Sequence, residues 1–182
     1  MPMKSDRQKL LKSGCRVVEQ VGFRGLTARA VAKEGAISTQ PIYLVFDNMT
    51  ELRDEVREYI FSLIRTNYFK ENKTISSFLK NYTKFIQEHP ELYLALFLDQ
   101  KEIRLQAETF FHRLLKESLE SQTDRVSEAG SSFLLSRITG MVASLIETNE
   151  IKNRPDMIEE LLEKTVMHDL QTFQECMENR DE

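Results

Sequence analysis

The sequence predicts an all-α protein, and two features of its composition carry this prediction. Only 6 glycines and 4 prolines occur among 182 residues, whereas an all-β fold needs many turns, which these residue types supply. Leucine, glutamate, lysine, arginine and glutamine, which are all good helix formers, are abundant. A chain of this length corresponds to one domain, or to a small domain joined to a larger one.

Capping residues, glycines and prolines place the helices along the chain. Thr27 is a good N-cap, Asn48 with Glu51 forms a capping box, and Pro90 and Pro155 each fit the first position of a helix. Gly22 is expected to end the first helix. We therefore expect about nine helices, with approximate bounds at 6–21, 28–34, 39–44, 49–69, 74–88, 90–98, 101–120, 125–149 and 155–177.

The two short helices near the N-terminus form a helix-turn-helix pattern. Helices 28–34 and 39–44 are joined by the turn Gly35-Ala36-Ile37, and Ser38 is expected to cap the second of them. Spacing predicts that one set of apolar residues forms the core of this small N-terminal head. These residues are Val31, Ile37, Ile42 and Phe46.

Charge is distributed unevenly between the N-terminal head and the rest of the chain. Residues 1–50 contain 8 Lys and Arg against 4 Asp and Glu, a net charge of +4. The remaining 132 residues contain 17 basic and 25 acidic residues, a net charge of −8. A basic head on an acidic body suggests that the head binds a polyanion while the body has another role.

Residues 8–56, roughly a quarter of the chain, resemble the tetracycline-repressor (TetR) family of bacterial transcription regulators. The resemblance combines many positions at fixed spacing. It is carried by the opening helix with Leu10-Leu11 and Val18, the connection Gly22-Phe23-Arg24-Gly25-Leu26-Thr27, the segments Val31-Ala32-Lys33, Ile37-Ser38 and Ile42-Tyr43-x-x-Phe46, and the segment Asn48-Met49-Thr50-Glu51-Leu52.

The chain departs from the family pattern at a few positions of the head. The family usually has its turn glycine just before the β-branched residue, whereas here Gly35 lies one position earlier and Ala36 takes that place. The turn can form provided that residue 36 is not strongly left-handed. Leu44 and Met49 stand where the family often has basic or aromatic residues, and the phosphate contact of residue 49 is expected to be lost.

The third helix is expected to enter the major groove of DNA through its N-terminal residues. Gln40 can bond adenine edges, Thr39 can contact a thymine methyl group, and Tyr43 can bond a phosphate. Residues near the start of the second helix can also reach phosphates. The predicted DNA-binding residues are Thr27, Arg29, Ser38, Thr39, Gln40, Pro41 and Tyr43, although Thr27 and Ser38 are also read as simple helix caps.

The body is rich in aromatic residues and in apolar helix faces. The family resemblance implies a small-molecule site there, which we assign to Phe61, Tyr68, Tyr82 and Phe97, although aromatic residues at helical spacing are often simply core. It also implies that the last two long helices pair with a second subunit. The predicted dimer interface is Val142, Ile146, Leu162 and Val166, and the alternative is that these residues only close the core of the monomer.

Other classes of function find little support in the sequence. It contains no glycine-rich phosphate loop, no G-x-S-x-G and no H-E-x-x-H pattern, and its three histidines are scattered, so we predict no enzyme, no cofactor and no metal. Cys15 and Cys176 lie far apart and are expected to be reduced thiols. No apolar stretch is long enough to span a bilayer and the N-terminus lacks a signal sequence, which suggests a cytoplasmic protein.

Together these patterns predict a homodimeric TetR-like regulator, most simply a repressor. Residues 1–48 would form the helix-turn-helix DNA-binding domain, and residues 49–182 the helical regulatory and dimerisation domain. Its partners would be a palindromic operator DNA, a second copy of the chain and a small effector of unidentified chemistry that releases the DNA. Two alternatives remain: a regulator controlled by a partner protein, and a helical ligand carrier or interaction protein whose head no longer binds DNA, which the residues at 44 and 49 favour.

Overall fold

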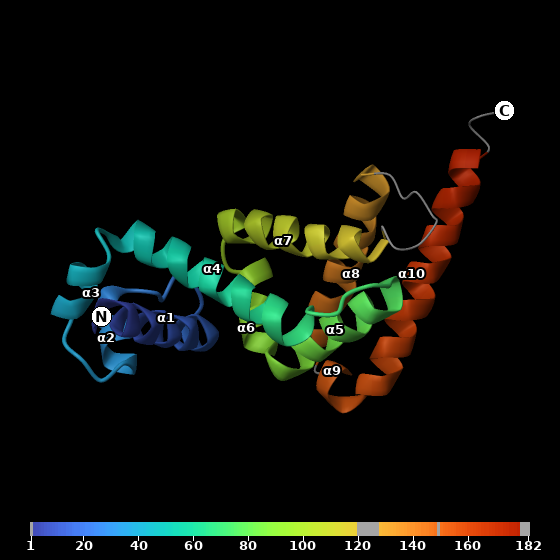
Figure 1. The fold of residues 1–182 in the computed structure, drawn as a ribbon. Coiled ribbons are helices and arrows are strands. Elements are labelled where there is room, and N and C mark those ends of the chain that lie inside the picture. The colour runs from blue at the N-terminus through green and yellow to red at the C-terminus, as the bar shows by residue number, and fades with distance from the viewer. Residues whose placement is uncertain (1, 120–127, 149, 179–182) are drawn as a thin grey trace. The chain divides into compact units, whose positions relative to one another are not determined.

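The computed structural model describes residues 2–119, 128–148 and 150–178, which form ten helices and no strand (Figure 1). This confirms the all-α fold that the sequence predicts. The helices are α1 (Pro2–Val21), α2 (Ala28–Glu34), α3 (Gln40–Val45), α4 (Met49–Tyr68), α5 (Ile75–Glu88), α6 (Pro90–Phe97), α7 (Lys101–Leu119), α8 (Glu128–Glu147), α9 (Glu150–Asn153) and α10 (Pro155–Glu178).

The helix bounds follow the predicted ones closely, with one addition. α2 has the predicted bounds, and α6 and α10 begin at the predicted prolines 90 and 155. The unpredicted element is α9, a single turn, too short to show helical periodicity. Residues 120, 125–127 and 149, which fall in predicted helices, lie outside the described residues, as does the side chain of Cys176.

The chain forms two compact units. The first unit comprises Met1–Asn67 and Glu91–Ala107, and the second comprises Tyr68–Pro90 and Glu108–Glu182. The predicted functional boundary after residue 48 is a different division and stays a prediction. In the part of the chain that the structure describes, no helix is long and apolar enough to cross a membrane.

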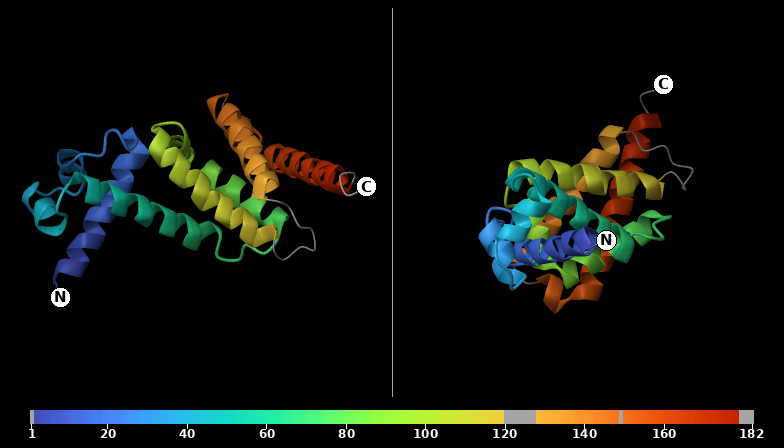
Figure 2. Two further views of the ribbon diagram at one scale, coloured as in Figure 1. Left: turned by 90° about the horizontal axis from the view of Figure 1, so that it is seen from above. Right: turned by 60° about the vertical axis from the view of Figure 1, so that its left-hand side comes forward.

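In the first unit, α1 packs against α2 and α3. The views in Figure 2 show α2 and α3 together at the N-terminal end of α4. α1 approaches α4 closely at Gly14, where a Cβ atom would overlap a methyl group of Val56. α1 ends directly before Gly22, as predicted; Gly22 has a φ of 71°, which suits glycine, and the next residue, Phe23, is buried.

In the second unit, α10 packs against α5, α8 and α9. A cluster of aromatic rings fills the region between α5 and α7, and Phe111 lies at its centre. The ring of Phe111 meets those of Tyr82 at 5.1 Å, Phe85 at 5.9 Å and Phe69 at 6.0 Å between centroids, with geometries typical of aromatic packing. The body aromatics in this cluster are therefore part of the core of the second unit.

Candidate nucleic-acid interface

The first helix of the helix-turn-helix is capped as the sequence predicts. The Thr27 hydroxyl accepts a hydrogen bond of 3.1 Å from the backbone N–H of Ala30, which satisfies one free donor of the first turn of α2. The Ile37 N–H then donates to the carbonyl of Ala32 at 3.0 Å, which closes the turn after α2. The start and end of α2 are thus fixed by local hydrogen bonds.

The turn between α2 and α3 forms with residue 36 in a left-handed conformation. Ala36 has a φ of 51°, in the region that glycine favours, so the turn forms without meeting the condition that the sequence pattern sets for this residue. Gly35, by contrast, is right-handed, with a φ of −80°. The turn therefore keeps the backbone shape of a glycine at position 36 and accepts the strain of an alanine there.

The start of α3 also corrects the prediction. The residue before the helix is Thr39 rather than Ser38, and its side chain makes no capping hydrogen bond. A cap at Ser38 would bond the N–H three residues later, but that residue is Pro41, which has none. The backbone instead closes the first turn, because the Ile42 N–H donates to the Thr39 carbonyl at 3.1 Å.

α3 buries one face and presents the other to solvent. Ile42 and Phe46 are buried in the head, as predicted, while Gln40 and Leu44 are exposed. Ile37 was predicted as core, yet 42% of its surface is exposed, because the left-handed residue before it turns the chain outward. The head core is therefore smaller than the apolar pattern indicates.

The predicted DNA-binding residues lie within the first unit, on α2 and its N-cap residue, on α3 and in the turn between the two helices. The structure exposes most of these side chains and half-buries two. The exposed residues are Thr27, Arg29, Ser38, Gln40 and Tyr43, and the half-buried ones are Thr39 and Pro41.

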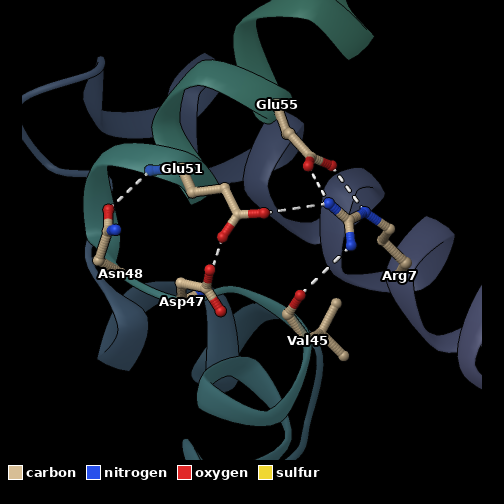
Figure 3. A network of polar contacts seen from close by, with 6 residues as sticks. All are labelled: Arg7, Val45, Asp47, Asn48, Glu51 and Glu55. Atoms are coloured by element: carbon tan, nitrogen blue, oxygen red, sulfur yellow. Dashed lines mark hydrogen bonds and ion pairs between the residues drawn. The ribbon is translucent and has the colours of Figure 1, made fainter.

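Arg7 of α1 connects the end of α3 to α4 (Figure 3). Its Nε donates to Glu55 at 2.8 Å and its Nη2 contacts both Glu55 and, at 3.3 Å, Glu51. Its Nη1 donates to the carbonyl of Val45, the last residue of α3, at 3.3 Å, and the guanidinium lies 5.0 Å from the centre of the Phe46 ring. The hydrogen bond to Glu55 raises the pKa of the Arg7 guanidinium above its ordinary value.

The carboxylate of Glu51 extends this network to the start of α4. It accepts a hydrogen bond of 2.6 Å from the Asp47 N–H, while Asn48 accepts from the N–H groups of Thr50 at 2.9 Å and Glu51 at 3.0 Å. The predicted capping box therefore forms with one change. The Glu51 carboxylate accepts from the N–H of Asp47, which is one residue N-terminal to the predicted partner Asn48. Arg7 of α1 thus contacts the last residue of α3 directly, and Glu51 of α4 bonds Asp47 in the segment that follows α3.

Internal ion pairs neutralise several arginines of the head but leave α2 charged. Arg7 faces two carboxylates, Arg16 lies 3.5 Å from Glu34, and Arg24 pairs with Asp99. Within the described residues, Arg29 and Lys33 of α2 form no ion pair and both are exposed. Arg29 and Lys33 therefore leave positive charge on α2, the first helix of the helix-turn-helix.

A second polar connection joins the end of α1 to the segment between α6 and α7. Nε of Arg24 lies 3.1 Å from Oδ1 of Asp99, and its Nη2 donates to the Asp99 carbonyl at 2.8 Å. The backbone N–H of Arg24 also donates to Oδ2 of Asp99 at 3.0 Å. A Cβ atom on Gly22 would lie 2.7 Å from that oxygen, so this approach requires glycine.

The four residues predicted to bind a ligand belong to different units. Phe61 and Phe97 are buried in the first unit, and Phe97 packs against Tyr93 with 4.6 Å between ring centroids. Tyr82 is buried in the second unit, where half-buried Tyr68 donates a hydrogen bond of 2.6 Å to Glu88. Their sharing of one ligand site stays a prediction.

The residues predicted for the dimer interface lie mostly inside the second unit. Val142, Leu162 and Val166 are buried within the single chain, and Ile146 is half-buried. Helical periodicity identifies an apolar stripe, but it does not say whether that stripe faces the chain's own core or a second chain. Among the side chains of α8 and α10 that the structure describes, the large apolar ones that are exposed are Phe133, Met157, Leu161 and Met167.

The fold has counterparts among solved structures. No protein-family model and no curated protein sequence matches this chain. The multidrug binding protein EbrR in complex with malachite green superposes with a TM-score of 0.62 at 16% identity, covering 90% of this chain and 96% of that one. A TetR-like transcriptional regulator from Rhodococcus sp. RHA1 gives 0.61 at 16% identity, covering 91% and 96%.

A further similar structure is the dihydroxyacetone kinase operon activator DhaS, with a TM-score of 0.57 at 16% identity, covering 93% of this chain and 96% of that one. The chain therefore has the fold of TetR-like transcriptional regulators. This confirms, for the fold, the resemblance that residues 8–56 indicate.

Proposed function

We propose that this protein is a TetR-like transcription regulator, without enzymatic activity, that binds operator DNA in the bacterial cytoplasm through its N-terminal helix-turn-helix. The observation that carries the proposal is the outward face of α3. Ile42 and Phe46 anchor this helix in the head, while Gln40 and Tyr43 point to solvent. Arg29 and Lys33, exposed on the neighbouring helix, supply positive charge for the phosphates on either side of a major groove.

The proposal includes a homodimer. A two-fold symmetric pair of heads would place two copies of α3 in successive major grooves, roughly 34–36 Å apart, which is the reason for a palindromic operator. Leu161 and Met157 lie four residues apart on α10, so they share an exposed apolar face that a second copy would cover. Phe133 and Met167 add to the exposed apolar surface of α8 and α10.

The body would bind the effector. EbrR forms complexes with malachite green and with imidazole, and a body rich in aromatic residues suits flat or apolar ligands. For this chain we propose an apolar small molecule as effector and repression as the mode of action. The ligand must bind the DNA-incompetent form more tightly, and DNA must then weaken ligand binding by the same factor.

The test is selection of DNA from a random pool by the full-length protein, followed by fluorescence anisotropy at fixed salt. We expect a palindromic sequence to be enriched and Gln40→Ala to lower affinity for it by about 5- to 150-fold. Arg29→Ala should instead weaken enriched and random DNA alike and reduce the salt dependence. Gln171→Ala on α10 is the matched control and should change neither.

The alternative function, a helical ligand carrier or interaction protein, is favoured by one observation. Leu44 exposes an apolar side chain on the face where DNA would bind, and Met49 offers no charge at the start of α4. If no sequence is enriched and random DNA shows no salt-dependent binding, the regulator proposal is overturned and this alternative stands.

A further inference from the structure

Leu44 is the most exposed large apolar residue in the part of the chain that the structure describes, with 75% of its surface accessible. Its position on α3 is well defined. With about 3.6 residues per turn, Gln40 and Leu44 lie one turn apart on the side opposite the buried Ile42. These two residues therefore form the centre of the outward face of α3.

The chemistry of this face is restricted. The sequence of α3 is QPIYLV, which contains no basic and no acidic side chain. The common contact to guanine is a bidentate hydrogen bond from arginine or lysine, and the common contact to cytosine is a carboxylate that accepts from its amino group. α3 can make neither contact, whatever its exact depth in the groove.

The remaining chemistry fits one class of base pair. A glutamine amide bonds the N6 and N7 edge of adenine, and an apolar side chain contacts the C5-methyl group of thymine. A leucine over a G·C pair would find no methyl group and would desolvate polar edge atoms without bonding them. Gln40 and Leu44 together therefore match A·T pairs.

The contacts at the C-terminal end of α3 hold this face in place. Arg7 bonds the carbonyl of Val45, directly after Leu44, and lies over the ring of Phe46. Phe46 is buried, and its N–H donates to the Ile42 carbonyl at 2.9 Å. Leu44 is thus an exposed side chain on a fixed backbone, which is the arrangement a specificity-determining contact needs.

We propose that Leu44 is a specificity-determining residue that reads a thymine methyl group, so that the bases α3 contacts in each half-site are A·T pairs. This inference rests on the proposed function, because it specifies which operators the same interface selects. It also gives the apolar residue at position 44, where the family often has a basic or aromatic residue, a role in DNA reading.

The test replaces each thymine of the selected half-site, one at a time, by deoxyuridine, which removes only the methyl group. Wild-type protein should lose about fourfold in affinity at the contacted thymine, the change expected for one buried methyl group. Leu44→Ala should bind thymine DNA more weakly than wild type and be insensitive to deoxyuridine at that position. Leu98, an exposed leucine directly after α6, provides the control. Leu98→Ala should keep the wild-type sensitivity to deoxyuridine.

A gain-of-function variant completes the experiment. Leu44→Arg supplies the bidentate donor that α3 lacks, so it should select G·C in place of A·T at the position that Leu44 contacts. The inference would be overturned if wild-type protein bound DNA with unchanged affinity after deoxyuridine replaced each thymine in turn. It would also be overturned if Leu44→Ala lost as much affinity as wild type on this replacement. In both cases the proposed DNA binding would still hold. Absence of any DNA binding by the wild type would overturn the proposed function as well, so the two failures are distinguishable.

Discussion

The Arg24 and Asp99 residues, 75 positions apart in the sequence, are joined by an ion pair and two hydrogen bonds in which every acceptor belongs to Asp99. One of these bonds comes from the backbone of Arg24, so it does not depend on the arginine side chain. The Arg24 side chain is 75% exposed, whereas that of Asp99 is only 17% exposed. The two residues should therefore contribute unequally to stability.

We expect Asp99→Ala to lower the free energy of unfolding by about 1–2 kcal/mol, since it leaves the Arg24 N–H without its acceptor. Arg24→Ala removes only an exposed pair and should cost about 0.5 kcal/mol. Urea denaturation followed by circular dichroism measures both. A larger loss for Arg24→Ala than for Asp99→Ala would contradict the geometry.

The left-handed Ala36 predicts a stabilising substitution. Ala36→Gly relieves the steric strain of a Cβ atom at a φ of 51°, partly offset by the greater freedom of glycine in the unfolded chain, so we expect a gain of about 0.5–1 kcal/mol. Ala30→Gly, within α2, is the matched control and should lose about 1 kcal/mol. Thermal unfolding of the two variants should move in opposite directions. A shift of the same sign would show that residue 36 is unstrained.

The Arg7 network predicts that lysine cannot replace arginine at position 7. Arg7→Ala leaves Glu51 and Glu55 facing each other and frees the end of α3, so we expect a loss of about 1–3 kcal/mol in urea denaturation. Arg7→Lys should recover less than half of this loss, because an ammonium cannot make the bidentate, carbonyl and ring contacts together.

The control for this prediction is another arginine of α1. Arg16→Ala removes an ion pair whose arginine is 67% exposed, and it should cost less than about 0.5 kcal/mol. Equal losses for the two alanine variants would argue against an organising role for Arg7. If Arg7→Lys matched wild type, a simple point charge would be sufficient at this position.

Substitutions at two neighbouring leucines of α10 should distinguish an effect on folding from an effect on assembly. Leu162 is buried within the chain, so Leu162→Glu places a charge in the core and should unfold the second unit. Leu161 is exposed, so Leu161→Glu should keep the helical circular dichroism signal while shifting the sedimentation of the protein from dimer to monomer at micromolar concentration. A wild-type chain that already sediments as a monomer would overturn the proposed dimer.

Cys15 predicts a loss of stability at alkaline pH. Burial, with a smaller contribution from the charge of Glu19, raises the pKa of its thiol from 9.0 to about 11. Between these two values the unfolded chain loses the thiol proton while the folded chain keeps it, so the free energy of unfolding falls as pH rises. From pH 9 to 11, we expect wild type to lose about 1–3 kcal/mol more than Cys15→Ala does. If the free energy of unfolding fell equally with pH in both proteins, the raised pKa of Cys15 would be contradicted.

Local physics determined the helices and the helix-turn-helix from the sequence. The Thr27 cap, the ends of α2, Gly22 as a helix stop and the prolines at 90 and 155 all depend on neighbouring residues, so short-range patterns were sufficient to place them. The exposure of Gln40 and Tyr43 followed from the same helical periodicity.

Tertiary structure alone decided which apolar faces are inside and which distant residues meet. Periodicity marked Leu162 and Val166 as an apolar stripe, but only packing showed that this stripe is used within the chain. The partners of Arg7 and Asp99 lie tens of residues away, and no short-range pattern encodes such pairs. The strain at Ala36 likewise comes from the geometry required between α2 and α3, which overrides the preference of alanine for right-handed backbone.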